Sequence, residues 1–186
     1  RLRMERIGPE GRKQITSAAN LAARGRRHSE AEKILRAQTE ERRPQHIGRG
    51  ERQLARWLRP LGRSRLAKAV GPYNVDIAIA DIAVEVFGGG WHGSGRHAAR
   101  FQDRLRYLFD REYHVIIVWN ERHCPLRRSA AEYVFSFAQS MRRDPLAQCQ
   151  YRVIRGTGQE VIAGCADDDQ FPIKPSRKSR FHIPLR

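Results

Sequence analysis

Acidic side chains are scarce in this chain of 186 residues, which has 20 Asp and Glu against 36 Lys and Arg and a formal net charge of +16. A basic surplus of this size favours a polyanionic partner over an acidic or neutral surface. Arginine outnumbers lysine, which suits bidentate contact with phosphate. The surplus is greatest before residue 50 and after residue 172, so we expect basic arms on a more balanced central domain.

Cysteines and long apolar runs are scarce as well. Cys124, Cys149 and Cys165 form no paired pattern, which argues against a disulfide framework and predicts a reducing compartment. No apolar run reaches the roughly 18 residues of a membrane span, and no signal peptide is visible. We therefore expect a cytoplasmic protein, of a bacterial, phage or similar nucleoid, with no membrane partner.

The apolar pattern divides the chain into three parts. Two helices that are polar nearly all round are predicted over 8–23 and 28–43, and residues 1–46 are expected to form a basic, helical DNA-binding arm. Residues 47–145 hold the central domain, and 146–186 form a C-terminal extension with a basic tail. Too few apolar residues occur before residue 46 for an independent core, so we expect this arm to order on nucleic acid.

Within the central domain, strands rich in Val and Ile alternate with amphipathic helices. The predicted order is a helix over 51–58, a hairpin of strands 75–79 and 82–87, a helix over 95–111, a strand over 115–119 and a helix over 127–141. Two weaker strands are predicted over 151–154 and 160–162. This order predicts an α/β fold with one central mixed sheet flanked by helices.

Two carboxylates interrupt the apolar strands of the hairpin. Asp76 lies in the first strand and Glu85 in the second, and period-2 alternation can place both on one face. Burying an unpaired carboxylate costs several kcal/mol, so two on neighbouring strands suggest a metal ion that neutralises both. On so basic a chain, a metal held by acids points to cleavage of a phosphodiester.

A glycine triplet and the pair Trp91-His92 follow the second strand. The glycines would let a DNA backbone approach closely, because no side chains intrude. His92 can accept a proton at neutral pH, and a nearby Asp103 would fix its tautomer. Arg96 and Arg100 on the next helix are candidates for contact with the scissile phosphate.

These residues together resemble the very-short-patch repair (Vsr-like) endonuclease branch of the PD-(D/E)XK, restriction-endonuclease-like superfamily. The resemblance covers roughly residues 50 to 141 and includes Tyr-Asn-Val-Asp76, Gly-Gly-Gly-Trp-His92 and Val-Ile-Ile-Val-Trp119. The succession of Glu51, Asp76, His92 and Asp103 is also similar to the EDxHD pattern of homing endonucleases. The resemblance implies a restriction-endonuclease-like core.

The resemblance also assigns roles to single residues. It implies that Asp76 coordinates a catalytic Mg²⁺, that Glu51 helps to hold the metal, and that Glu85 occupies the place of the superfamily's second metal carboxylate. His92 would act as general base or orient the attacking water, and Asp103 would hydrogen-bond that histidine. Mn²⁺ is expected to substitute for Mg²⁺.

Two departures from the family pattern affect this assignment. Phe87 replaces the lysine of the superfamily's E-x-K motif, so His92 must supply proton transfer. Gly89 and Arg96 stand where the repair enzymes have cysteines that ligate zinc, so we predict no zinc. Gly25-Arg26-Arg27-His28 and the helix after it are similar to the modular DNA-binding repeats of homing endonucleases, which makes Arg26 and Arg27 candidate DNA contacts.

We therefore expect a magnesium-dependent endonuclease acting on double-stranded DNA, and a site-specific homing enzyme in particular. A mismatch-nicking repair endonuclease and a non-catalytic nucleic-acid-binding protein remain as alternatives. The oligomeric state stays open, with a homodimer as one arrangement. Each candidate also has an ordinary structural explanation. Glu85 could pair with an arginine, and His92 could be a core histidine. Asp76 could be a capped, exposed strand residue, Asp103 a solvated helix acid paired with a neighbouring arginine, and Glu51 a first-turn acid favoured by the helix dipole.

Overall fold

The computed structural model describes residues 8–23, 25–61, 64–88, 95–144 and 148–175, and within these ranges it leaves the side chains of residues 22, 23, 61 and 95–98 undescribed. The described helices are α2 (Pro9–Ala23), α3 (Glu30–Arg42), α4 (Arg49–Leu58), α5 (Gly95–Phe109) and α6 (Arg128–Arg143), with a 3-10 turn, η1 (Arg59–Leu61). The strands are β1 (Ser64–Val70), β2 (Tyr73–Ile79), β3 (Ile82–Gly88), β4 (His114–Asn120), β5 (Gln150–Arg155) and β6 (Glu160–Cys165).

The six strands form one sheet in the order β1-β2-β3-β4-β5-β6. Strands β3, β4 and β5 run parallel, and the remaining neighbours are antiparallel, so the predicted mixed α/β fold is confirmed. The predicted hairpin is also present, because Ile79 pairs with Ile82 across a turn at Ala80 and Asp81. No helix among the described residues is both long and apolar enough to cross a bilayer.

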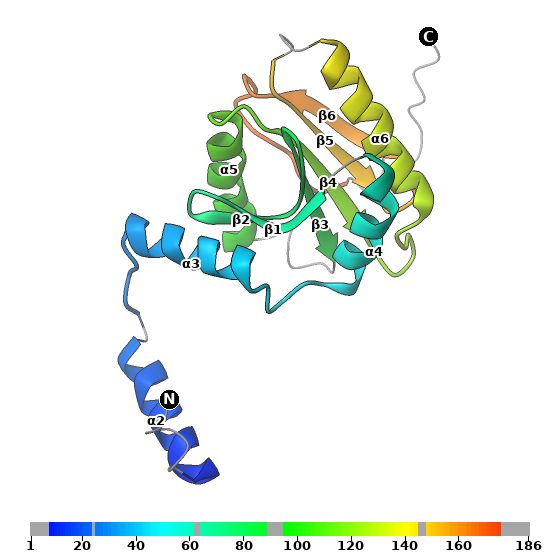
Figure 1. The fold of residues 1–186 in the computed structure, drawn as a ribbon. Helices are drawn as coiled ribbons and strands as arrows, with labels where there is room; N and C mark the ends of the chain where they lie inside the picture. Colours follow the sequence, from blue (N-terminus) through cyan, green and yellow to red (C-terminus); the bar gives the residue numbers. More distant parts are fainter. Residues whose placement is uncertain (1–7, 24, 62–63, 89–94, 145–147, 176–186) are drawn as a thin grey trace.

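Helices cover both faces of the sheet (Figure 1). On one face, α4 and α6 pack on alternate side chains of the strands, including Ile77, Val84 and Ile116. On the other face, α5 covers Ala83, Phe87 and Ile117, and the segment after β6 adds Phe171 and Ile173. The central strand β4 is buried along six of its seven residues, as expected for a parallel strand with helices on both sides.

The edge strand β1 was not predicted from the sequence. Five of the seven residues in its segment, Ser-Arg-Leu-Ala-Lys-Ala-Val, are charged or small, and Ala67 adopts a positive φ of 50° within it. Side-chain contacts stabilise it against its neighbours. Asn74 of β2 donates through Nδ2 to the carbonyls of Ala67 (2.9 Å) and of Ala37 in α3 (2.8 Å), so one amide joins α3, β1 and β2.

Helix α3 is therefore packed on the same unit as the sheet. Ala37 is buried, and Glu41 pairs with Lys68 of β1 at 3.1 Å. The two halves of the expected arm differ, because every described side chain of α2 is exposed or half-exposed and this helix extends away from the remainder (Figure 1). At the other end, β5 and β6 continue the central sheet, so residues 150–173 belong to the core rather than to a separate extension.

Candidate active site

Asp76 lies at the point where β2 and β3 separate. The pairing between these strands runs from Ile79–Ile82 to Ile77–Val84 and goes no further toward Asp76. The Asp76 side chain then takes the place of the missing ladder bond, because its Oδ2 accepts a hydrogen bond of 2.7 Å from the Val86 amide. The carboxylate is thereby fixed at a fork in the sheet, near the C-terminal end of β3.

Helix α4 brings Glu51 to the same place. A methyl group added to Gly50 would lie 2.9 Å from Asn120 Nδ2 and 3.4 Å from a methyl of Val86, so the absence of a side chain at Gly50 permits close packing. Asn120 ends β4 and is itself held, because its Oδ1 accepts from the Leu126 amide at 3.0 Å. The first turn of α4 therefore lies against the C-terminal ends of the parallel strands β3 and β4.

The carboxyl groups of Glu51, Asp76 and Glu85 are close enough that neighbouring acids disfavour the charge of Glu51 and of Glu85. Burial, and then the charge of Asp76, raises the pKa of Glu51 to about 7, although the Gly48 amide and Arg52 act against this. Burial raises the pKa of Asp76, while the Val86 amide and Arg104 lower it. Burial raises the pKa of Glu85 well above its usual range, and Asp76 and Glu51 add to this while Arg104 opposes it.

Arg104 of α5 provides the positive charge beside this acid cluster. The sequence pattern did not identify it. Its guanidinium pairs with the carboxylate of Glu85, which is 2% exposed, and also donates to the Asn74 carbonyl. The rings of Tyr73 and Phe101 lie 5.8 and 5.7 Å from the guanidinium carbon. The structure therefore shows the ordinary structural explanation considered for Glu85, a salt bridge to an arginine.

The remaining candidate residues are only partly described. His92 and the glycine triplet from Gly89 onward fall outside the described residues, as does the side chain of Arg96. Asp103 and Arg100 are exposed and border a hollow of about 380 Å³ with Tyr73 and Tyr107. The described structure thus brings Glu51, Asp76 and Glu85 together and leaves Asp103 on an exposed surface of α5.

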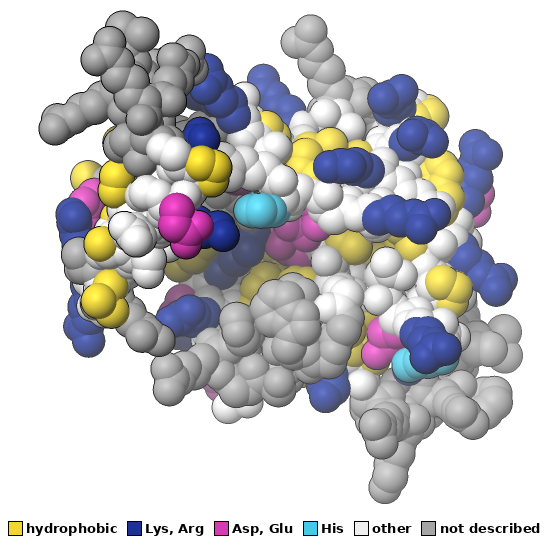
Figure 2. Space-filling model, turned by 90° about the horizontal axis from the view of Figure 1, so that it is seen from below, with side chains coloured by type: hydrophobic (Ala, Val, Ile, Leu, Met, Phe, Trp, Pro, Cys, Tyr) yellow, Lys and Arg dark blue, Asp and Glu magenta, His cyan; other side chains and the backbone are white. Residues whose placement is uncertain are grey.

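The two candidate arginines of the arm have different surroundings. Arg26 pairs with Glu32, the residue that also completes the capping box of α3 with Ser29. Arg27 is exposed. Seen from below, the molecule is hollowed near its centre, with acidic and basic side chains inside the hollow (Figure 2).

The acid cluster fits a hard divalent cation only in part. No group of three or more His, Cys, Asp and Glu side chains is arranged as a metal site within the described ranges. Mg²⁺, however, is usually held by one or two carboxylates and several waters. Glu51 and Asp76 provide such a pair, and burial, the main cause of their raised pKa values, disfavours their charged forms unless a cation compensates them. Glu85 fits less well, because Arg104 already neutralises it.

Replacing Arg104 tests the ion pair. Arg104→Met leaves a buried, unpaired Glu85, so we expect the free energy of unfolding to fall by about 3–5 kcal/mol. Adding Glu85→Leu should recover most of this loss, because an apolar pair of similar size can replace a buried ion pair. Urea unfolding measures both, with the exposed Arg100→Met as a control expected to change by less than about 0.5 kcal/mol. An unchanged Arg104→Met protein would contradict the pairing.

Glu51 should make folding stability depend on pH. Its pKa is higher in the folded chain (about 7) than its usual 4.5, so the folded state binds the extra proton and loses stability as pH rises through this interval. Without divalent cations, Glu51→Gln should be more stable than the parent by about 1–2 kcal/mol at pH 8, with the difference vanishing near pH 4. Urea titrations at several pH values measure this. Glu132→Gln, an exposed control, should show no such trend; equal curves for the parent and Glu51→Gln would contradict the prediction.

Comparison with protein-family models, with curated proteins and with solved structures gives no match. The case for a function therefore rests on the arrangement of the chain's own residues.

Proposed function

We propose that this protein is a metal-dependent endonuclease that hydrolyses phosphodiester bonds of double-stranded DNA. The observation that carries the proposal is the meeting of Glu51 and Asp76, from a helix and a strand, at the fork between β2 and β3. Each carboxylate is only half-buried, and neither has a cationic side chain in an ion pair within the described residues. Two half-buried acids without an ion-pair partner among these residues are suited to binding a metal cation. On a chain of net charge +16, such a cation can in turn bind a phosphate group of nucleic acid.

Glu51 and Asp76 are the residues that would hold Mg²⁺, with Mn²⁺ as a substitute. The bound ion would supply Lewis-acid stabilisation of the phosphate and an activated water. Asp76 is held by the Val86 amide and Glu51 by the first turn of α4, so both ligands are oriented before any ion arrives. Arg104 forms an ion pair with the neighbouring Glu85, so this third acid does not need a second metal ion to balance its charge. Glu85 then contributes to the shape of the site.

Within this proposal, His92 accepts the proton of the attacking water, and Asp103 orients His92. These two roles rest on the resemblance described above. A site-specific homing enzyme is the biology we favour, because the sequence has no counterpart of the zinc ligands of the repair endonucleases and has a basic N-terminal region.

A non-catalytic nucleic-acid-binding protein is the second candidate. The observation in its favour is the Glu85–Arg104 pair, which replaces one expected metal ligand by an internal salt bridge. A domain that had lost its chemistry would keep the basic surface and would have no need for acids free to bind a metal. Both candidates bind DNA, but only the endonuclease cleaves it when Mg²⁺ is present.

Nicking of supercoiled plasmid separates these candidates. We expect the parent to convert supercoiled DNA to nicked or linear DNA with Mg²⁺ and to stop with a chelator. Asp76→Asn should lower the rate at least about 100-fold by weakening the metal site, while its amide oxygen can still accept from the Val86 amide. Asp81→Asn is the matched control, an exposed acid at the turn of the same hairpin, and it should cut like the parent.

The outcomes of this assay are separable. Cutting by Asp76→Asn at the parental rate would contradict the assigned site. Absence of metal-dependent product from a folded parent that binds the same DNA would favour the non-catalytic candidate.

A further inference from the structure

Helix α4 has a second surface, opposite the one that packs on the sheet. Its buried side consists of Leu54, Ala55 and Leu58. Its exposed side, continued into η1, has arginine at a spacing of 3, 4 and 3 residues, which places the four side chains in one row along the helix. We call this row the arginine face; its members are Arg49, Arg52, Arg56 and Arg59.

The positions of these arginines are not explained by helix stability alone. Cations are favourable near the C-terminus of a helix and unfavourable in the first turn. Arg56 and Arg59 fit that rule, but Arg49 and Arg52 lie near the N-terminus of α4. Arg52 is offset in part by Glu51, whose pKa it lowers. None of the four forms a salt bridge within the described part of the chain, whereas Arg26, Arg104 and Arg155 each pair with an acid.

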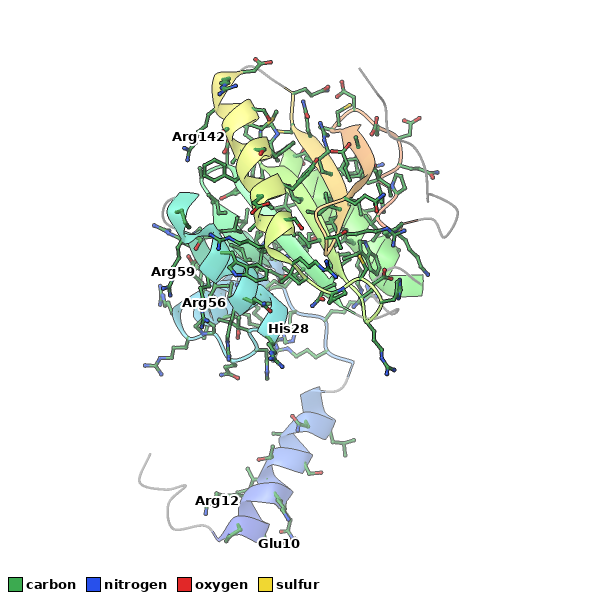
Figure 3. All side chains as sticks on the ribbon, turned by 90° about the vertical axis from the view of Figure 1, so that its right-hand side faces the viewer. Glu10, Arg12, His28, Arg56, Arg59 and Arg142 are labelled. Carbon is green, nitrogen blue, oxygen red and sulfur yellow. The ribbon has the colours of Figure 1, made fainter. Side chains whose placement is uncertain are left out.

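Helix α6 continues the same basic surface. It packs beside α4, and its last turn ends in Arg142 and Arg143, both exposed and without a salt bridge to any described residue. Figure 3 shows Arg56, Arg59 and Arg142 projecting from the same side of the molecule. The surface therefore spans two helices.

We propose that the arginine face, together with the end of α6, binds the phosphate backbone of duplex DNA. A helix of ten residues is about 15 Å long, and one strand of B-DNA carries a phosphate about every 3.4 Å of duplex axis, so the face covers the axial rise of about four phosphates of that strand. Guanidinium groups suit this ligand because they donate in a fixed bidentate geometry. Glu51 is on the same helix, at its N-terminal end, so a strand held along the face is guided toward the acid cluster.

This proposal deepens the proposed function by giving the DNA a path, and it depends on that function only for what happens at Glu51. It also shifts the main DNA contact from the arm to the folded domain, because Arg26 of the arm is already paired with Glu32. Binding and cleavage are measured separately below, so the failure of one does not decide the other.

The test measures the affinity of the full chain for a 30-base-pair duplex, by fluorescence anisotropy in chelator, from 50 to 200 mM salt. In the double variant Arg56→Gln/Arg59→Gln, affinity at low salt should fall at least about tenfold. The slope of log affinity against log salt should become shallower by about 2, because each lost phosphate contact removes about 0.9 from it. Arg52 is left intact because it acts on Glu51.

Arg106→Gln/Arg111→Gln is the matched control, with the same loss of charge near the end of α5. It should keep the parental slope and affinity within about twofold. A parental slope in Arg56→Gln/Arg59→Gln, or equal loss in both double variants, would overturn the proposal, as would a parent that binds anionic lipid vesicles but not the duplex. A parent that binds through this face without cutting plasmid would support the proposal while rejecting the nuclease.

Discussion

The cost of placing carboxylates inside a sheet governs this structure. Asp76 and Glu85 interrupt apolar strands, and Glu51 is brought against them by α4. Burial acts to remove the charge of all three, and repulsion by a neighbouring acid adds to this at Glu51 and Glu85. Arg104 offsets part of that cost at Glu85, and the Val86 amide offsets part of it at Asp76. Since buried ion pairs rarely stabilise a fold more than apolar residues would, retention of so many charges points to a role other than stability.

The strands are arranged around this cluster. The hydrogen-bonded pairing between β2 and β3 ends before Asp76, whose side chain accepts a hydrogen bond from the Val86 amide instead. On the opposite edge of β2, Ala67 of β1 has a left-handed backbone conformation. Gly50 allows the first turn of α4 to close over the opening. The fork thus forms a site from segments that are distant in sequence, while the buried strand β4 beside it provides a rigid support.

Periodicity was enough to predict most of the fold. The strongly apolar strands and the two amphipathic helices after them appear within a few residues of the predicted ranges, because burial on a sheet or helix face leaves a clear pattern. Strand β1 left no such pattern, since it is an edge strand held partly by the Asn74 side chain. The packing of α3 was missed for a similar reason, because it depends on the polar contacts of Asn74 and Lys68 rather than on an apolar stripe.

The site was predictable in its acids but not in its cation. Carboxylates in apolar strands are conspicuous, so Asp76 and Glu85 stood out, and the predicted antiparallel hairpin was the reason to expect them near each other. Arg104 is one of four arginines between Arg100 and Arg111 on or just after α5, and only the three-dimensional arrangement shows which one turns inward. Its position three residues after Phe101 and just before Leu105, beside two buried side chains, was the available signal.

The most direct test of the account is a count of the divalent ions bound to the protein, by Mn²⁺ titration followed by electron paramagnetic resonance at pH 8. The account predicts bound Mn²⁺ in the parent and in the double variant Glu85→Leu/Arg104→Met, and its loss in Glu51→Gln and in Asp76→Asn. Equal Mn²⁺ binding by all four proteins, or none by a folded parent, would contradict the claim that Glu51 and Asp76 together hold the ion.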